Sequence, residues 1–360
     1  ARGAAGAARG LGGGGGGGRA GAGAAERELP RLGLPSKGRM AEDTLALLKT
    51  SQMGVRKLNP RQYAAEIPAL PGLEVWFQRA TDCVRKLSYG DIDIAIVGYD
   101  MFREVAADND DLIVVHDALK FGKCHLALAV PKEGRWAQVT SYEDLVGLGW
   151  TAEEPLRVVT GYPNLADEFF KERGFEHFEV LSADGALEAA PAMGCADIIL
   201  DLVSTGTTLR ENNLREIVGG NVLESEGVLV ASRRALKERP DLMNIVKEMI
   251  ERVEAHLQAE QFFTVICNVR GDSQGQVAEA MIEAGLGGLE GPTVAPVFRG
   301  TGVNSSPTFA VTICVRKKAL SGVIKELRSL GGSGVLVTPI TYIFEDEPWR
   351  WRDLLQRLED

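Results

Sequence analysis

The sequence predicts an α/β protein in which helices cover both faces of parallel sheets, followed by a smaller sandwich of ferredoxin-like βαββαβ type. Three observations predict it. Several short strands, such as residues 91–98 and 196–203, are apolar on both faces. Amphipathic stretches of helical length separate these strands. After residue 261 the pattern changes to a strand–helix series that fills the last 99 residues, 262–360, which is enough for a separate small domain.

Each element follows from its apolar period. Strands are expected at residues 31–34, 73–78, 91–98, 125–131, 156–161, 175–181 and 196–203, and helices at 40–52, 82–90 and 164–174. The chain continues through 227–236 into a long helix over roughly 242–261. Strands at 262–270, 308–317 and 334–344 alternate with helices at 274–285 and 319–331, before an amphipathic tail whose two tryptophans should pack on the core or on another subunit.

We expect three folded domains after an N-terminal leader. A loose segment at 147–155 precedes a fresh strand, which places the crossing between the first two domains near residues 131–155. The expected division is 29–130 with 220–261 for the first domain, 131–219 for the second and 262–360 for the third.

Residues 1–28 form the expected leader. It holds seven consecutive glycines and no acid before Glu26, so it cannot bury enough apolar surface to fold. A segment that contains arginine and lacks acids is typical of an organelle transit peptide, which predicts a plastid location. A leader without function on a cytoplasmic protein is the alternative.

Bulk composition excludes several classes of function. The formal net charge of −10 argues against a general nucleic-acid binder. No apolar run approaches the roughly 20 residues of a membrane-spanning helix, so we expect no membrane partner. The five cysteines are scattered and form no C-x-x-C pair, which predicts reduced, buried thiols.

A hydroxyl-rich loop follows the predicted strand at 196–203. Asp201 lies near the carboxyl end of that strand, where open α/β sheets bind their ligands. A capping-box pattern at residues 208–211 predicts a helix start at about Thr208. Backbone N–H groups of its first turn would bind a phosphate, and Asp201 would accept from sugar hydroxyls or face a magnesium-bound group. These residues favour a phosphoribose site over an ordinary capped helix; they are Asp201, Ser204, Thr205, Gly206, Thr207 and Thr208.

Basic residues follow two other predicted strands. Lys37 and Arg39 flank Gly38 between the first strand and the first helix, as a phosphate-binding loop or as a solvated basic turn. Arg79 follows the strand at 73–78, and Asp82 could act as the N-cap of the next helix.

Two further strand ends are candidates for nucleotide binding. Gly98, Tyr99 and Asp100 end the strand at 91–98, either to admit a nucleotide or to form a tight turn. Tyr162 precedes a proline at a predicted helix start, so that this helix N-terminus would be open to anions.

The chain resembles ATP phosphoribosyltransferase of the long form, the first enzyme of histidine biosynthesis, over about residues 30–360. The matching residues are Glu188, Gly194, Ala196, Ile199, Asp201, Leu202, Thr205, Gly206, Thr208 and Leu209. The resemblance implies two periplasmic-binding-protein-like α/β domains that form a catalytic cleft, and a C-terminal ferredoxin-like regulatory domain.

The same resemblance implies the site residues. Residues 204–208 would hold the 5′-phosphate of phosphoribosyl pyrophosphate and Asp201 its ribose hydroxyls. Lys37, Arg39, Arg79 and Asp201 would be the catalytic residues. ATP would contact Lys37, Gly38, Arg39, Arg79, Gly98, Asp100, Tyr162 and Glu188, although Glu188 could equally cap structure.

The implied reaction is displacement of pyrophosphate from the anomeric carbon by N1 of ATP. The implied cofactor is Mg2+, with no direct protein ligand except Asp201 through a magnesium-bound group. The chain would form homo-oligomers, a dimer and a hexamer. Histidine would inhibit the enzyme between subunits of the hexamer, with Thr293, Gly332 and Ser333 as contacts; the same third domain could instead serve assembly alone.

Two rival functions remain at this stage. Two α/β domains around a cleft also describe a non-catalytic solute-binding module. A nucleobase or orotate phosphoribosyltransferase would usually show two adjacent acids before the loop, whereas Asp201 follows Leu200 and stands alone.

Overall fold

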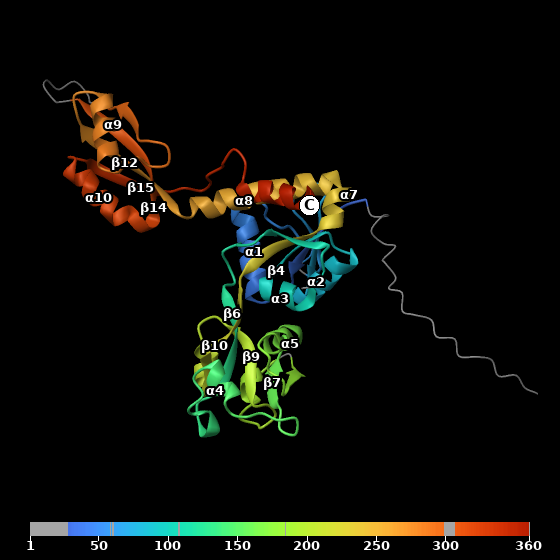
Figure 1. The fold of residues 1–360 in the computed structure, drawn as a ribbon. Helices are drawn as coiled ribbons and strands as arrows, with labels where there is room; N and C mark the ends of the chain where they lie inside the picture. The colour runs from blue at the N-terminus through green and yellow to red at the C-terminus, as the bar shows by residue number, and fades with distance from the viewer. Residues whose placement is uncertain are drawn as a thin grey trace, which may run out of the picture.

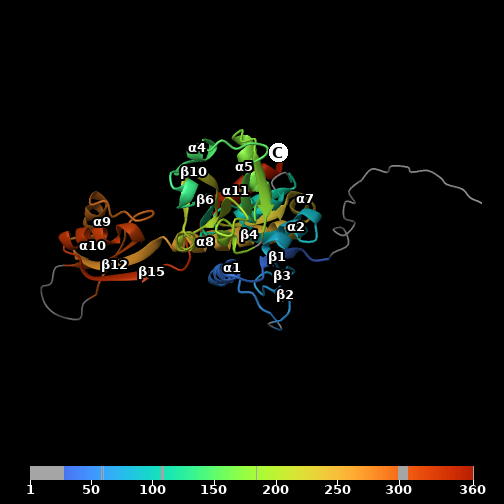
Figure 2. The ribbon, with the colours of Figure 1, turned by 90° about the horizontal axis from the view of Figure 1, so that it is seen from below.

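The structure is a computed structural model that describes residues 28–57, 59, 61–106, 109–183, 185–298 and 307–359. Nearly all of the predicted leader, and the link 299–306, lie outside these residues. Three sheets organise the described chain. Figures 1 and 2 show two adjoining lobes and a third body that stands apart, joined to the first lobe by a long helix.

The first lobe is built on a six-stranded sheet in the order β2-β3-β1-β4-β11-β5. Its strands are β1 (Arg31–Pro35), β2 (Ala64–Glu66), β3 (Glu74–Gln78), β4 (Ile94–Gly98), β5 (Leu112–His116) and β11 (Gly227–Ser232), and its helices are α1 (Arg39–Thr50), α2 (Ala80–Tyr89), α3 (Tyr99–Ala106), α7 (Arg233–Glu238) and α8 (Pro240–Ala259). The strands β3, β1 and β4 are parallel, so their carboxyl ends share one edge.

Helices cover both faces of this sheet because its central strands alternate apolar residues between two cores. Ile94 and Ile96 pack in the core that contains residues of α1 and α8. Ala95 and Val97 pack in the core that contains residues of α2 and α3. The apolar run at 91–98 therefore indicated a doubly covered strand correctly.

The second lobe has a five-stranded sheet in the order β10-β6-β9-β7-β8. Its strands are β6 (Cys124–Pro131), β7 (Leu156–Thr160), β8 (Phe178–Ser182), β9 (Ile198–Val203) and β10 (Leu214–Ser225); its helices are α4 (Tyr142–Val146), α5 (Pro163–Glu172) and α6 (Thr207–Glu211), with 3-10 turns η1 (Gly134–Trp136) and η2 (Leu187–Ala189). The strands β7, β8 and β9 are parallel, and β6 runs antiparallel to β9. Edge-to-face rings of Phe169, Phe170 and Phe175 fill its core.

The chain crosses between the lobes earlier than the sequence suggested. The strand β6 pairs with β9, and β10 pairs with β6, so both belong to the second lobe. The crossings lie at residues 117–123 and at Glu226, and the expected boundaries at 130/131 and 219/220 are wrong. An apolar strand such as 125–131 looks the same whichever sheet it joins, which is why its sequence did not reveal its lobe.

The third body has the βαββαβ order of a ferredoxin-like domain. It consists of β12 (Phe262–Arg270), α9 (Gln274–Glu283), β13 (Thr293–Pro296), β14 (Thr308–Arg316), η3 (Lys317–Ala319), α10 (Leu320–Ser329) and β15 (Ser333–Pro339). The sheet order is β13-β14-β12-β15, and the pairs in it are antiparallel. The predicted fold class is confirmed.

The C-terminal helix α11 (Trp349–Glu359) returns from the third body to the first lobe and lies alongside α8 (Figure 1). Trp351 and Leu354 are buried in the core of the first lobe. Trp349 is exposed in this chain, so Trp351 is the tail tryptophan that packs on the core as predicted. The tail is therefore part of the fold of the first lobe.

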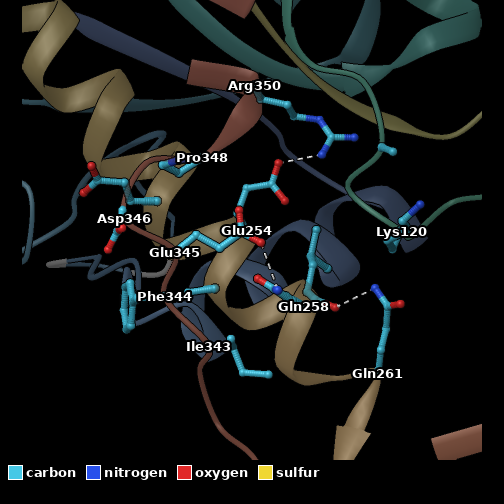
Figure 3. A pocket seen from close by; sticks show the side chains of 14 residues that line it. Lys120, Glu254, Gln258, Gln261, Ile343, Phe344, Glu345, Asp346, Pro348 and Arg350 are labelled. Atoms are coloured by element: carbon cyan, nitrogen blue, oxygen red, sulfur yellow. Dashed lines mark hydrogen bonds and ion pairs between the residues drawn. The ribbon is translucent and has the colours of Figure 1, made fainter. Parts of the chain in front are cut away.

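Arg350 attaches this tail at two points. Its guanidinium forms an ion pair with Glu254 of α8 and donates to Asp117, at the start of the first crossing, over 2.6 and 2.8 Å. Figure 3 shows the Arg350–Glu254 contact at the rim of a hollow of about 360 Å³ between α8 and the returning segment. Gln258 donates to Glu345 across the same hollow at 3.0 Å.

Two smaller findings complete the fold. The helices of the described chain include none that is long and apolar enough to cross a membrane. Cys195 is exposed, unlike the buried thiol that the sequence predicted.

Candidate functional site

The hydroxyl-rich loop is open to solvent where β9 ends. Ser204, Thr205, Thr207 and Thr208 are exposed, and the Thr205 and Thr207 hydroxyls lie 3.1 Å apart. Gly206 has a φ of 66°, in the left-handed region that favours glycine. A ligand could therefore reach the loop without a prior conformational change.

The helix after this loop differs from the expected one. Gly206 occupies the N-cap position of α6, and no side chain caps the helix, so the predicted capping box at 208–211 does not form. The helix is only five residues long, and β10 begins at Leu214 where the helix was expected to continue. A helix this short contributes little dipole, so anion binding must rest on the loop's own N–H groups, hydroxyls and nearby cations.

Asp201 lies partly buried in β9, close to this loop. Burial raises the pKa of its carboxyl, the Leu202 N–H bonded to it at 2.8 Å opposes that rise, and the charge of Glu188 adds to it. Its second oxygen makes no hydrogen bond with the described residues. Asp201 thus offers one free acceptor beside the loop.

A hollow of about 690 Å³ lies where the two lobes meet. Its lining joins the end of β4, both crossings and the start of the loop: Tyr99, Val114, Asp117, Lys123, Cys124, His125, Ser204, Glu224, Ser225 and Glu226. Because Tyr99 and Ser204 belong to different lobes, the hollow is an interlobe cleft. Lys123 and His125 were not expected from the sequence, since nothing in their surroundings marks them as site residues.

The basic loop of the first lobe meets Arg79 at one sheet edge. Pro35, the last residue of β1, pairs with Gln78, the last residue of β3. The segments with Lys37 and Arg39 and with Arg79 therefore leave the sheet next to each other, at the carboxyl ends of neighbouring strands. All three side chains are exposed, and none has an ion-pair partner within the described residues. Arg79 occupies the N-cap position of α2, so Asp82 is a first-turn residue and not the cap.

Gly38 fixes the shape of this basic loop. Its φ of 77° and ψ of −179° lie in a region that is essentially restricted to glycine. Its carbonyl accepts from Ala41 and Glu42 as α1 begins. Lys37 and Arg39 therefore flank a backbone turn in which a residue other than glycine at position 38 would be strained.

Asp100 and Tyr162 are hydrogen-bonded to each other. The Tyr162 hydroxyl donates to one Asp100 oxygen at 2.8 Å, and Ser225 donates to the other at 2.6 Å. Both Asp100 and Tyr162 are buried. The Asp100 carboxylate also fills the space that a Cβ at position 98 would need, so Gly98 admits this carboxylate and not a nucleotide. Direct contact of these three residues with ATP would require breaking this network.

The N-terminus of α5 is not open to anions, contrary to expectation. Glu104 of α3 is buried, and its two oxygens accept the backbone N–H groups of Asn164 and Leu165, each at 3.0 Å. Burial raises the pKa of Glu104, while these two bonds oppose the rise. An acid of the first lobe already occupies the place where a ligand anion would bind.

Arg210 is a third feature that the sequence reading missed. Its guanidinium folds back from α6 and donates to the Thr205 carbonyl and the Thr207 hydroxyl, both at 3.0 Å. The three-residue spacing from Thr207 puts both residues on one helix face and could have indicated this contact. Near it, His125 forms a hydrogen bond with Glu216.

Comparison with known proteins identifies the family. A family model for ATP phosphoribosyltransferase matches residues 79–255, and a model for its C-terminal domain matches residues 259–342. The chain is 54% identical over 336 residues to ATP phosphoribosyltransferase 1, chloroplastic, of Arabidopsis thaliana, covering 92% of this chain and 82% of that protein. The chain belongs to the ATP phosphoribosyltransferase family.

Other relatives agree with this family. ATP phosphoribosyltransferase 2, chloroplastic, of Arabidopsis thaliana is 55% identical over 92% of this chain and 81% of its own length. Among solved structures, the ATP phosphoribosyl transferase (HisG:HisZ) complex from Thermotoga maritima is similar, with 22% identity, a TM-score of 0.49, and coverage of 63% of this chain and 98% of that one. The family models and the two Arabidopsis relatives show that the chain is an ATP phosphoribosyltransferase-family enzyme, a pentosyltransferase of the first step of histidine biosynthesis, as predicted. The chloroplastic relatives also confirm the predicted plastid location.

The residues expected to bind regulatory histidine are far apart within one chain of this ATP phosphoribosyltransferase. Thr293 lies on β13 and Ser333 on β15, the two opposite edges of the third sheet, and Gly332 directly precedes β15. Three strand spacings separate those edges, or roughly 14 Å. One histidine molecule could touch both edges only across a subunit boundary.

Proposed function

We propose that the chain transfers the phosphoribosyl group of phosphoribosyl pyrophosphate to N1 of ATP, with residues 204–208 holding the 5′-phosphate. The observation that carries the proposal is the exposed loop of hydroxyls that follows Asp201, whose first residue, Ser204, lines the interlobe hollow. Family membership supplies the two substrates. The products are phosphoribosyl-ATP and pyrophosphate.

The charges of the site suit this substitution. The bond from the anomeric carbon to pyrophosphate breaks as the bond to adenine N1 forms, so positive charge develops on the ribosyl centre and negative charge leaves with pyrophosphate. We assign Lys37, Arg39 and Arg79 to the leaving group and the ATP phosphates, because these exposed cations have no acidic partner among the described residues. Asp201 orients the ribose through its free oxygen and stabilises the developing positive charge.

In this proposal ATP binds at the carboxyl ends of β1 and β3 in the first lobe, where Gly38 determines the backbone conformation of the basic loop. Glu188 lies close enough to Asp201 to affect its pKa, which supports a place for it at the substrate. We revise the expected role of Gly98, Asp100 and Tyr162. Asp100 and Tyr162 are bonded to each other, and Gly98 makes room for the Asp100 carboxylate, so we propose a structural role for all three behind the cleft.

The reaction uses a divalent metal ion, and we propose Mg2+. Among the described residues, no group of three or more His, Cys, Asp or Glu side chains is placed to hold an ion by itself. Mg2+ would therefore be held mainly by the phosphate oxygens of the substrates, and the free oxygen of Asp201 could accept from a water bound to the ion. When bound, the ion would neutralise charge on the leaving pyrophosphate.

We also propose that histidine inhibits the enzyme through the third domain, between subunits of a hexamer assembled from dimers. The separation of Thr293 from Ser333 within one chain supports a site shared by subunits. Loss of activity at millimolar histidine, together with hexamer mass in light scattering, would support this assignment.

Pyrophosphate release tests the activity. Wild-type protein with Mg2+, phosphoribosyl pyrophosphate and ATP should release pyrophosphate, and free bases should not replace ATP. Asp201→Asn should lower kcat/KM for phosphoribosyl pyrophosphate about 100-fold, the order expected for one lost transition-state contact. The matched control is Asp167→Asn, an exposed acid of the same lobe. Equal activity of Asp201→Asn and wild type would refute the assigned role.

A further inference from the structure

Arg210 carries a positive charge that forms no ion pair within the described protein. Both hydrogen-bond partners of its guanidinium, the Thr205 carbonyl and the Thr207 hydroxyl, are neutral oxygens. No carboxylate of the described residues lies within ion-pair distance of it. By contrast, Arg135 and Arg157 of the same lobe both pair with Asp197.

One acid lies near Arg210 without forming an ion pair with it. Glu216 lies beside Gly206 with its Oε1 toward the same space as the Arg210 guanidinium, and its Oε2 is engaged by His125. The two side chains nevertheless form no ion pair. A Cβ at position 206 would lie 3.2 Å from the Arg210 guanidinium, which is tighter than most such contacts. Gly206 therefore serves two purposes: it adopts the left-handed turn, and it leaves room for the guanidinium to lie against the loop.

A phosphate monoester needs such a cation. At neutral pH it carries up to two negative charges, whereas the loop itself offers only neutral hydroxyls and N–H groups. The five-residue α6 adds little dipole. A guanidinium fork is suited to phosphate oxygens and holds them with directed, charge-assisted bonds.

We propose that Arg210 is a binding residue for the 5′-phosphate, holding the loop in its receiving shape and supplying the charge that the short helix does not. This inference rests on the proposed function, since it assumes that the loop receives a phosphate. On this proposal the cations of the site bind different ends of phosphoribosyl pyrophosphate. Arg210 binds the 5′-phosphate, and the basic loop of the first lobe binds the pyrophosphate.

The test uses ribose 5-phosphate and inorganic pyrophosphate as separate probes in calorimetry on the full chain. Arg210→Met should weaken ribose 5-phosphate at least 10-fold, leave pyrophosphate binding within twofold, and reduce the salt dependence of ribose 5-phosphate binding. Arg210→Lys, which keeps the charge without the fork, should recover part of the loss. Lys171→Met removes a positive charge from the same lobe away from the loop and should bind both probes like wild type.

The outcomes separate this inference from the proposed function. If wild type binds ribose 5-phosphate and Arg210→Met binds it equally well, the role of Arg210 is wrong while the function stands. If wild type itself binds neither ribose 5-phosphate nor phosphoribosyl pyrophosphate, the proposed function is wrong. Because Arg210 is exposed, its variants should keep the wild-type Tm, so a binding loss would not reflect unfolding.

Discussion

Glu104 on helix α3 of the first lobe accepts the backbone N–H of Leu165 on α5 of the second lobe, at 3.0 Å. Its other oxygen accepts from Asn164, so a single buried carboxylate satisfies two N–H groups at a helix end. The Asn164 side chain returns a bond to the Glu104 carbonyl at 2.9 Å. These hydrogen bonds therefore join the two lobes, and we expect any closure of the cleft to pivot about this contact.

Glu104→Gln should destabilise the protein by about 1–2 kcal/mol, because an amide offers one acceptor where the carboxylate offers two. It should also raise KM for both substrates, since the lobes lose their fixed orientation. Urea denaturation and steady-state kinetics measure these effects. Glu168→Gln, which removes a half-exposed ion pair with Arg103 at the same contact, should cost less than about 1 kcal/mol. Equal losses in the two variants would contradict the capping role.

Gly38→Ala should destabilise the protein by about 1–3 kcal/mol through backbone strain alone, because no atom would crowd the added Cβ. The displaced Lys37 and Arg39 should lower kcat/KM for phosphoribosyl pyrophosphate. Gly54→Ala is the matched control: its Cβ also meets open space, and its φ is not in the left-handed region. Thermal unfolding compares the two, and an equal effect would argue against strain at position 38.

Asp201→Asn should stabilise the protein at pH 7.5 while it lowers activity. Burial raises the pKa of Asp201, so the folded state holds this proton to a higher pH than the unfolded state does. Ionisation at neutral pH therefore costs folded-state stability, and asparagine avoids that cost. The gain in Tm should shrink as pH falls through the folded-state pKa toward the unfolded value of 3.8. Asp167→Asn should show no such gain, and a lower Tm for Asp201→Asn would contradict the sign.

His116 should make the protein sensitive to acid. Burial, together with the positive charge of Arg350, lowers the pKa of His116 to about 3, although the nearby Asp117 opposes this and Lys120 adds to it. Its Nε2 lies 3.6 Å from Glu254, beyond hydrogen-bond distance, and makes no hydrogen bond. Below pH 6.5 the unfolded state binds a proton that the folded state does not, so stability is lost as pH falls, by up to about 1.4 kcal/mol per pH unit. His116→Gln should flatten this decline between pH 7 and 5 in urea titrations; an unchanged slope would exclude His116 as its source.

Arg350→Met should loosen the C-terminal tail and cost about 1–3 kcal/mol, because Glu254 and Asp117 lose charge-assisted bonds. Limited proteolysis should then cleave the segment before α11 faster than in wild type. Arg352→Met is the control, since Arg352 is exposed and has no side-chain partner in the described chain. Identical cleavage rates for the two variants would contradict the attachment.

Local patterns predicted the parts of the fold that local physics determines. The central strands β4 and β9 were evident because both of their faces are apolar. The strand β10 was missed because its pairing with β6 is irregular and its sequence carries two glycines, so it shows neither a strand period nor a clear end to the preceding helix. Its partner lies about 90 residues away, between Leu214 and Pro131 at one end and Ser225 and Cys124 at the other.

The site divides in the same way. The exposed loop at 204–208 could be recognised as a candidate because its hydroxyls and glycine lie in consecutive residues; its phosphate-binding role stays a prediction. The capping role of Glu104 could not be predicted. In the sequence it is an acid on a short amphipathic helix, which is typical of a solvent-exposed residue, and its partner lies 60 residues away. Gly98 illustrates the remaining error: a glycine at a strand end indicated close approach correctly, but the approaching group is Asp100 and not a nucleotide.

The return of α11 to the first lobe makes the third domain an insertion, flanked on both sides by pieces of the catalytic body. Ending the chain near residue 262 would remove that domain and also strip Trp351 and Leu354 from the core they complete. A clean excision would join the end of α8 to the segment before α11 through a short flexible bridge. An enzyme shortened in this way should keep its catalytic core, whereas simple truncation should yield an aggregation-prone protein.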